Sequence, residues 1–134
     1  MDAEELRNML PEGKHDVKRA RALVKLGYPT VIPVLPELLG YMLDANWPIA
    51  QVMRPFLTSI GEPLAPYVRD VLATDDTIWK IWVMEIVGDS PALAAALYSE
   101  IQQLAAMIPK DEDEEWLLEE VHRLFPNVLD KQPG

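Results

Sequence analysis

Four polar side chains at two turns of this chain are the residues best suited to chemistry: His15, Asp16, Asp44 and Asn46. An imidazole and a carboxylate can exchange protons with a bound molecule, and an amide can orient it. These side chains support one hypothesis, a small-molecule-binding or hydrolytic helical domain that uses polar turn residues in a cleft between its helices.

The chain contains no recognised set of catalytic or metal-binding residues. It has no cysteine, and neither of its two histidines lies at a spacing typical of metal ligands. Its glycines are isolated, so no phosphate-binding loop is present, and His15 beside Asp16 does not make a catalytic triad. We therefore expect a protein that is not an enzyme, with no catalytic residue, no metal and no cofactor.

Two further groups of polar residues have ordinary structural explanations. Asp75 and Asp76 could act as acid and base, but they precede an apolar segment, where the helix dipole favours acidic capping residues. His122 follows Glu119 by three positions and is expected on the solvated face of a helix.

The formal charge of −10 restricts the classes of partner. Binding to nucleic acid or to an anionic membrane depends on lysine and arginine, so neither is expected. A basic protein is favoured instead, because opposite charge accelerates encounter. The acidic start of the chain does not resemble a signal peptide, which predicts a cytoplasmic protein.

The apolar segment 75–88 is the element around which the fold is expected to form. Between Ile78 and Val87 only Lys80 and Glu85 are polar, so a helix here needs other helices on nearly every side. It is too short to cross a bilayer. The length and the hydrophobic fraction of 49% predict a single domain over residues 1–134.

Turns of two kinds alternate along the chain. In the first kind a glycine follows an apolar residue and a proline comes two or three positions later, at Gly27–Pro29, Gly61–Pro63 and Gly88–Pro91. There we expect a left-handed glycine to end one helix, with Pro29 opening the next. The second kind carries polar capping residues, near 44–48, 74–77 and 109–112. The pattern predicts about three stacked helical hairpins with helical caps.

The turns divide the chain into expected helices near residues 2–10, 16–26, 30–43, 47–60, 63–73, 77–87, 91–108 and 112–125. Four prolines fall inside them, Pro33, Pro36, Pro55 and Pro66, and each would remove a helical hydrogen bond, so kinked helices are expected. The alternative is an extended segment from Pro33 to Pro36, with the helix beginning only at Pro36.

Five segments carry a resemblance to a known family: Leu10-Pro11-Glu12-Gly13-Lys14-His15-Asp16, Leu26-Gly27-Tyr28-Pro29, Asp44-Ala45-Asn46-Trp47-Pro48, Gly61-Glu62-Pro63 and Ile78-Trp79-Lys80-Ile81-Trp82. In this order they resemble a bacterial family known as domain of unknown function 5071, over about residues 9–87. The resemblance implies an all-α fold, a HEAT-like alpha-alpha superhelix of bacterial origin. It implies no catalytic residue.

Tryptophans near the turns suggest a binding surface. Trp47 and Trp79 occupy early positions in their helices and could form an aromatic surface, or they could be core; Trp82 is expected in the core. The candidate partner-binding residues are Trp47, Asn46, Asp44, Trp79, Lys80, His15 and Asp16.

Two charged segments have both a plain and a functional interpretation. Lys14, Lys18, Arg21 and Lys25 recur along one stripe of the second helix, either as a solvated face or as a dock for an acidic segment. The acidic run 111–115, whose acids the dipole of the last helix stabilises, either forms an acidic cap on the end of the stack or attracts a basic protein.

We therefore favour a non-enzymatic protein-interaction module of a bacterial cytoplasm, such as an immunity or inhibitor protein that neutralises a basic toxin. The expected partner is another protein, with no nucleic acid and no membrane, and the chain is expected to be a monomer or a weak homodimer.

Overall fold

The computed structural model describes residues 1–129, which form helices and no strand, so the all-α prediction is confirmed for this part of the chain. The last five residues of the expected domain lie outside the described residues. The chain divides into two compact units, Met1–Ile60 and Gly61–Gly134. The single domain expected over residues 1–134 stays a prediction.

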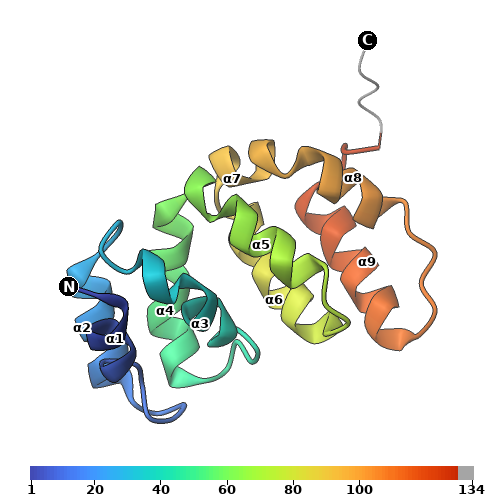
Figure 1. Cartoon of the computed structure of the whole chain (residues 1–134). Helices are drawn as coiled ribbons and strands as arrows, with labels where there is room; N and C mark the ends of the chain where they lie inside the picture. Colours follow the sequence, from blue (N-terminus) through green and yellow to red (C-terminus); the bar gives the residue numbers. More distant parts are fainter. Residues whose placement is uncertain (130–134) are drawn as a thin grey trace. The chain divides into compact units, whose positions relative to one another are not determined.

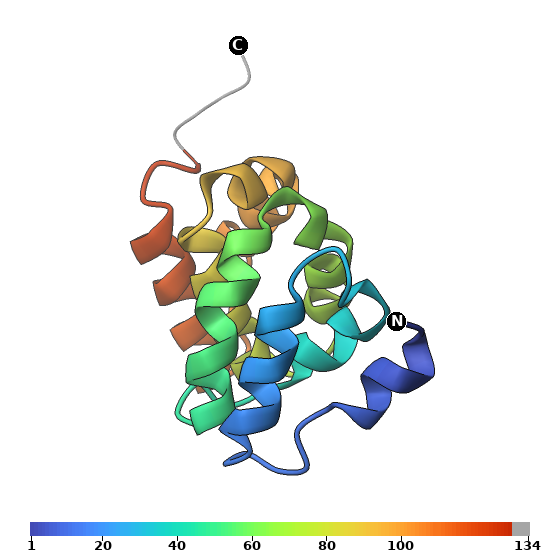
Figure 2. The same cartoon turned by 90° about the vertical axis from the view of Figure 1, so that its left-hand side faces the viewer.

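The first unit packs two longer helices against each other. Its elements are α1 (Ala3–Asn8), α2 (Val17–Leu26), the 3-10 turn η1 (Ile32–Val34), α3 (Leu35–Gly40) and α4 (Pro48–Ile60). Helix α2 lies alongside α4, and α1 packs against η1 (Figure 2). The apolar side chains that these elements share, including Leu6, Leu23, Leu38 and Leu57, are fully buried.

The second unit is built around α6, the apolar segment that the sequence analysis placed at the centre. Its elements are η2 (Glu62–Leu64), α5 (Ala65–Leu72), α6 (Thr77–Gly88), α7 (Pro91–Ala96), α8 (Tyr98–Ala105) and α9 (Glu112–Leu124). Helix α6 packs against α5, α7 and α9 (Figure 1). Its residues Ile81, Met84 and Ile86 are completely buried. Among the described residues, no helix combines the length and the apolar character that crossing a membrane requires.

Short polar side chains begin most of the longer helices, because the first N–H groups of a helix have no partner within it. The side chains of Asp16, Asp76 and Asp111 each accept a hydrogen bond from the backbone N–H three residues later. Ser90 does the same for α7. The capping roles predicted for Asp16, for Asp76 and for the polar turn at 109–112 are confirmed, whereas the N-cap of α6 is Asp76 and not Asp75.

The cap of α6 provides a matched pair of variants. We expect Asp76→Ala to lower the free energy of unfolding by about 0.5 to 2 kcal/mol, because the N–H of Trp79 then loses the carboxylate that lies 3.1 Å away. Asp75→Ala removes the same charge one position earlier, outside the cap, and should cost less. Urea unfolding followed by circular dichroism measures both values, and equal losses would contradict a capping role.

The glycine turns follow the prediction only in part. Gly27 and Gly61 both have φ of 74°, which favours glycine, but their ψ values of 178° and −138° are not those of a left-handed helical residue. Gly88 lies inside α6, where a Cβ would stand 2.7 Å from a methyl carbon of Leu124 on α9. The prediction that Pro29 opens a helix is wrong, because Pro29 follows a cis peptide bond in a turn and the next helical turn begins at Ile32.

Most of the internal prolines occupy first turns, where the missing N–H costs nothing. Pro33, Pro36 and Pro66 lie at the first or second position of η1, α3 and α5. Only Pro55 is interior to a described helix, α4. The single kinked helix and the extended segment from Pro33 to Pro36 are both wrong, because a 3-10 turn leads directly into α3, which begins one residue before the alternative start at Pro36.

The segment 91–108 forms two helices where one was predicted. Helix α7 ends at Ala96, and α8 starts at Tyr98 after Leu97, a fully buried residue with φ of −108° and ψ of 15°. Burial of Leu97 fixes this corner. The alanine-rich sequence is continuous across this corner and does not indicate where one helix ends and the next begins.

Helices α8 and α9 are joined by a bond from His122, which is exposed as predicted for the solvated face of a helix. The Nε2 atom of His122 lies 2.9 Å from the carbonyl oxygen of Ala105, at the end of α8. A carbonyl in the last turn of a helix has no intrahelical partner. The histidine thus satisfies a free carbonyl group and connects the two helices.

An ion pair joins α5 to α8 and makes stability depend on pH. The Nε of Arg69 donates to the Glu100 carboxylate at 2.8 Å, and this bond lowers the pKa of Glu100. Because the folded pKa is the lower one, the pair stabilises the fold above the ordinary glutamate pKa, and the effect is lost as pH falls through the folded pKa. We expect Glu100→Gln to cost about 0.2 to 1 kcal/mol at pH 7, a cost that vanishes in acid. Urea unfolding across this pH range tests it, and a constant difference would contradict it.

Candidate functional site

Five of the seven candidate binding residues lie at one end of the first unit. The turns that carry them meet where the N–H of Ile49 donates to the carbonyl oxygen of Lys14 at 3.2 Å. This bond places the turn before α2 beside the turn before α4. His15 and Asn46 are exposed, whereas Asp16, Asp44 and Trp47 are partly buried. We call these five residues the polar end.

The carboxylates of the polar end bind backbone groups of their own turns. Asp16 accepts from the N–H groups of Glu12 at 3.0 Å and Arg19 at 3.3 Å, and Asp44 accepts from that of Asn46 at 2.8 Å. The bond from Glu12, with the bond and the charge of Arg19, lowers the pKa of Asp16. An aspartate held in its ionised form is a poor general acid, so these contacts favour a structural role for Asp16.

A tyrosine close to the polar end has an altered ionisation. Burial raises the pKa of the Tyr41 phenol, and the nearby carboxylates of Glu37 and Asp16 raise it further. A phenol with a raised pKa stays protonated at neutral pH and acts as a hydrogen-bond donor. Tyr41 adds a neutral polar group to this end of the unit, and nothing in its spacing within the sequence pointed to it.

The other two candidate residues, Trp79 and Lys80, belong to the first turn of α6 in the second unit, and both are partly buried. Trp82, predicted as core, is also partly buried. Its ring meets the ring of Trp116 on α9 edge to face, with centroids 5.5 Å apart. An aromatic pair of this geometry contributes about 0.5 to 1.5 kcal/mol beyond the area it buries. These two tryptophans lie 34 positions apart, and nothing in the sequence connects them.

The basic stripe is exposed, as a solvated face or a dock would require. Lys14, Lys18, Arg21 and Lys25 are all exposed, but Lys14 precedes α2, so the prediction that all four lie on this helix is wrong for Lys14. The remaining basic residue of this region, Arg19, binds the carbonyl oxygen of Asn8 at 2.7 Å and pairs with Glu12 and Asp16.

The negative charge is distributed unevenly between the units. Residues 1–60 contain seven acidic and seven basic side chains, which cancel, and residues 61–134 contain the other fifteen acidic and five basic ones. The whole formal charge of −10 therefore belongs to the second unit.

Helix α9 carries a large part of this charge. Glu112, Asp113, Glu115 and Glu119 are exposed, while Leu117 and Val121 on the other side of the helix are buried. The Oε2 atom of Glu114 lies 3.6 Å from Nζ of Lys110, and Oε2 of Glu120 lies 2.6 Å from Nη2 of Arg123. Trp116, with 38% of its surface exposed, stands among the four acidic side chains. We call Glu112, Asp113, Glu115, Trp116 and Glu119 the acidic face.

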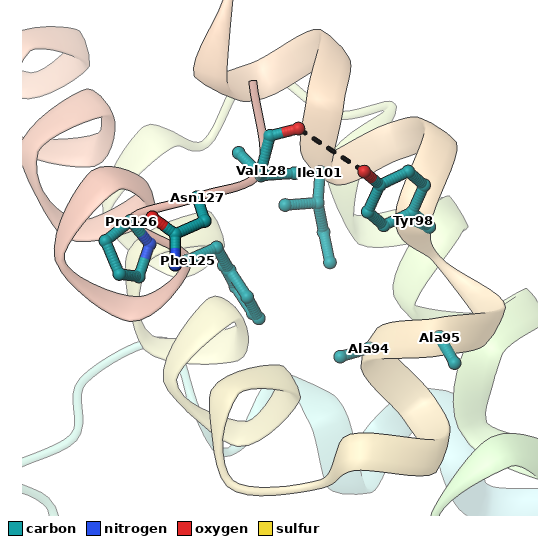
Figure 3. Close-up of a pocket in the computed structure, with 8 residues that line it drawn as sticks. All are labelled: Ala94, Ala95, Tyr98, Ile101, Phe125, Pro126, Asn127 and Val128. Atoms are coloured by element: carbon teal, nitrogen blue, oxygen red, sulfur yellow. Dashed lines mark hydrogen bonds between the residues drawn. The ribbon is translucent and has the colours of Figure 1, made fainter. Parts of the chain in front are cut away.

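The second unit also contains an apolar hollow of about 260 Å³, formed by α7, α8 and the segment that follows α9 (Figure 3). Its lining residues are Ala94, Ala95, Tyr98, Ile101, Phe125, Pro126, Asn127 and Val128. This hollow was not predicted from the sequence. The only available signal was Phe125-Pro126, an aromatic residue followed by a proline just after the last helix.

Comparisons with known proteins identify the family but no activity. A comparison with curated proteins finds no match. The family model for a domain of unknown function (DUF5071) matches residues 9–125, a longer stretch than the 9–87 that carried the resemblance in the sequence. The chain therefore belongs to the family of domain of unknown function 5071.

Proposed function

We propose that this chain is a non-enzymatic protein-interaction domain that binds a basic polypeptide through its second unit. The observation that carries the proposal is the placement of the entire formal charge of −10 on residues 61–134. A concentrated field of one sign raises the rate of encounter with an oppositely charged partner by factors of about 10 to 1000.

The acidic face is the surface at which we expect a basic partner to bind. Its four carboxylates are exposed and belong to a single helix, whose buried side is fixed against α6 and α8. Trp116 adds an aromatic surface of the kind that concentrates binding energy in protein interfaces. Charge at the rim then sets the association rate, and the aromatic group contributes to affinity.

An immunity or inhibitor protein for a basic toxin, acting in a bacterial cytoplasm, is the specific form that we propose. Small size, acidity and a rigid helical scaffold suit a protein that must find a basic target quickly. The HEAT-like superhelix implied by the resemblance would extend the available surface. Small-angle scattering of the full chain tests that arrangement, and the same experiment tests the expectation of a monomer or weak homodimer.

Affinity purification of the tagged chain from the organism that encodes it tests the function. We expect a basic protein to be recovered at low salt and released at high salt, because screening weakens contacts between exposed charges. The matched control is a chain in which Asp113, Glu115 and Glu119 are replaced by their amides, and it should recover much less of that protein. Recovery of no protein, even after cross-linking, would overturn the proposal.

A further inference from the structure

The hollow of the second unit is lined for an uncharged occupant. Ala94 stands on one side, and Phe125 and Ile101 point toward the same space across from it (Figure 3). The only polar side chains in the lining are the phenol of Tyr98 and the amide of Asn127. Pockets with mainly apolar walls and a few polar groups are typical of specific binding sites.

The volume of the hollow limits the size of its occupant. A cavity of about 150 Å³ is enough to hold benzene, and sites for drug-sized ligands run from about 300 to 1000 Å³. At about 260 Å³ the hollow suits one aromatic ring or one branched aliphatic group. A single side chain of a polypeptide has this size.

The mouth of the hollow is accessible, because the residues at its rim are exposed. Tyr98 is 37% exposed, and Pro126 and Asn127 are exposed as well. The Tyr98 hydroxyl donates to the carbonyl oxygen of Val128 at 3.4 Å (Figure 3). An entering side chain would meet the tyrosine ring at the rim.

The charge of the surrounding unit identifies the kind of partner. Residues 130–134, Asp-Lys-Gln-Pro-Gly, contain no aromatic or branched aliphatic side chain that could supply the occupant. The unit that forms the hollow carries the whole charge of −10, which favours a partner that carries lysine and arginine. We propose that the hollow receives one apolar side chain, aromatic or branched, of a basic polypeptide. This inference rests on the proposed function and gives it an anchor site.

Two synthetic peptides test the inference on the full chain. Both contain the same lysines around a central residue, which is phenylalanine in one and alanine in the other. We expect the phenylalanine peptide to bind about tenfold more tightly, since burying that ring removes a large apolar surface from water. NMR titration should place its chemical-shift changes at Ala94, Ile101 and Val128.

Two variants separate the hollow from the rest of α7. Ala94→Leu puts a larger side chain into the hollow and should abolish the preference for phenylalanine. Ala92→Leu makes the same change at an exposed position of α7 outside the lining and should preserve the preference. The comparison of the two peptides on the unaltered chain stands even if one variant fails to fold.

Each remaining outcome overturns the inference and leaves a distinct conclusion. Equal affinity for both peptides would mean that charge alone attracts them, which contradicts the hollow and leaves the proposed function intact. Binding of p-cresol in the hollow without binding of either peptide would indicate a small-molecule site. If neither peptide nor p-cresol binds, the hollow is not an anchor site, while recovery of a basic protein from cells would still support the function.

Discussion

Replacing Ile81 by alanine is expected to lower the free energy of unfolding of the second unit by about 2 to 5 kcal/mol. Ile81 is fully buried in α6, the helix that packs against α5, α7 and α9. Removing its outer carbon atoms loses the energy of transferring them from water and leaves a cavity that the neighbouring helices fill only in part. Urea unfolding with hydrogen exchange of individual amides shows both the size of the loss and its location.

Ile81→Val is the graded control for this variant. It removes one methylene group and is expected to cost about 0.5 to 1.5 kcal/mol. Faster exchange should appear in α5, α6 and α9, which share this core. A loss below 0.5 kcal/mol for alanine would contradict the central position assigned to α6.

Neutralising three carboxylates of the acidic face is expected to weaken binding of a decalysine peptide about tenfold at low salt. The variant combines Asp113→Asn, Glu115→Gln and Glu119→Gln, three exposed side chains of α9. The difference should shrink toward zero at about 1 M salt, where the Debye length is near 3 Å. Calorimetric titration at several salt concentrations measures it.

The control variant makes the same change of net charge in the other unit. It combines Glu4→Gln, Glu5→Gln and Glu12→Gln, which are also exposed. We expect a much smaller loss of affinity, because those residues belong to a unit whose charges cancel. Equal losses for both variants would show that net charge alone, and no particular surface, attracts the peptide.

The elements that could be predicted are those determined by local physical chemistry. The segment that became α6 is apolar on nearly all sides, so only a surrounded helix could bury it, and five of its residues are buried. Asp16 and Asp76 cap helices because a free N–H at a helix start needs an acceptor wherever the helix lies. Such signals depend on a few neighbouring residues.

The errors arose where a local signal had two structural solutions. Proline inside an apolar run suits either a kink or a first turn, and packing placed Pro33, Pro36 and Pro66 in first turns. The corner between α7 and α8 falls at Leu97, whose side chain is fully buried. Neither choice is visible in a window of sequence.

In the candidate site, too, local features could be predicted from the sequence and contacts between distant residues could not. Adjacent polar residues at turns were identifiable, but the use of the Asp16 and Asp44 carboxylates by backbone N–H groups depends on turn geometry. The contact between Trp82 and Trp116 and the hollow beneath Phe125 both join residues that are distant in the sequence. Pairings of this kind require the packed structure.

Carbodiimide cross-linking of the chain to the protein recovered from its own cells tests the central claim most directly. This reagent joins carboxylates to lysine amines that are in contact. We expect mass spectrometry to identify a basic partner whose lysines are joined to carboxylates of the acidic face. Cross-links confined to residues 1–60, or a partner that is itself acidic, would contradict it.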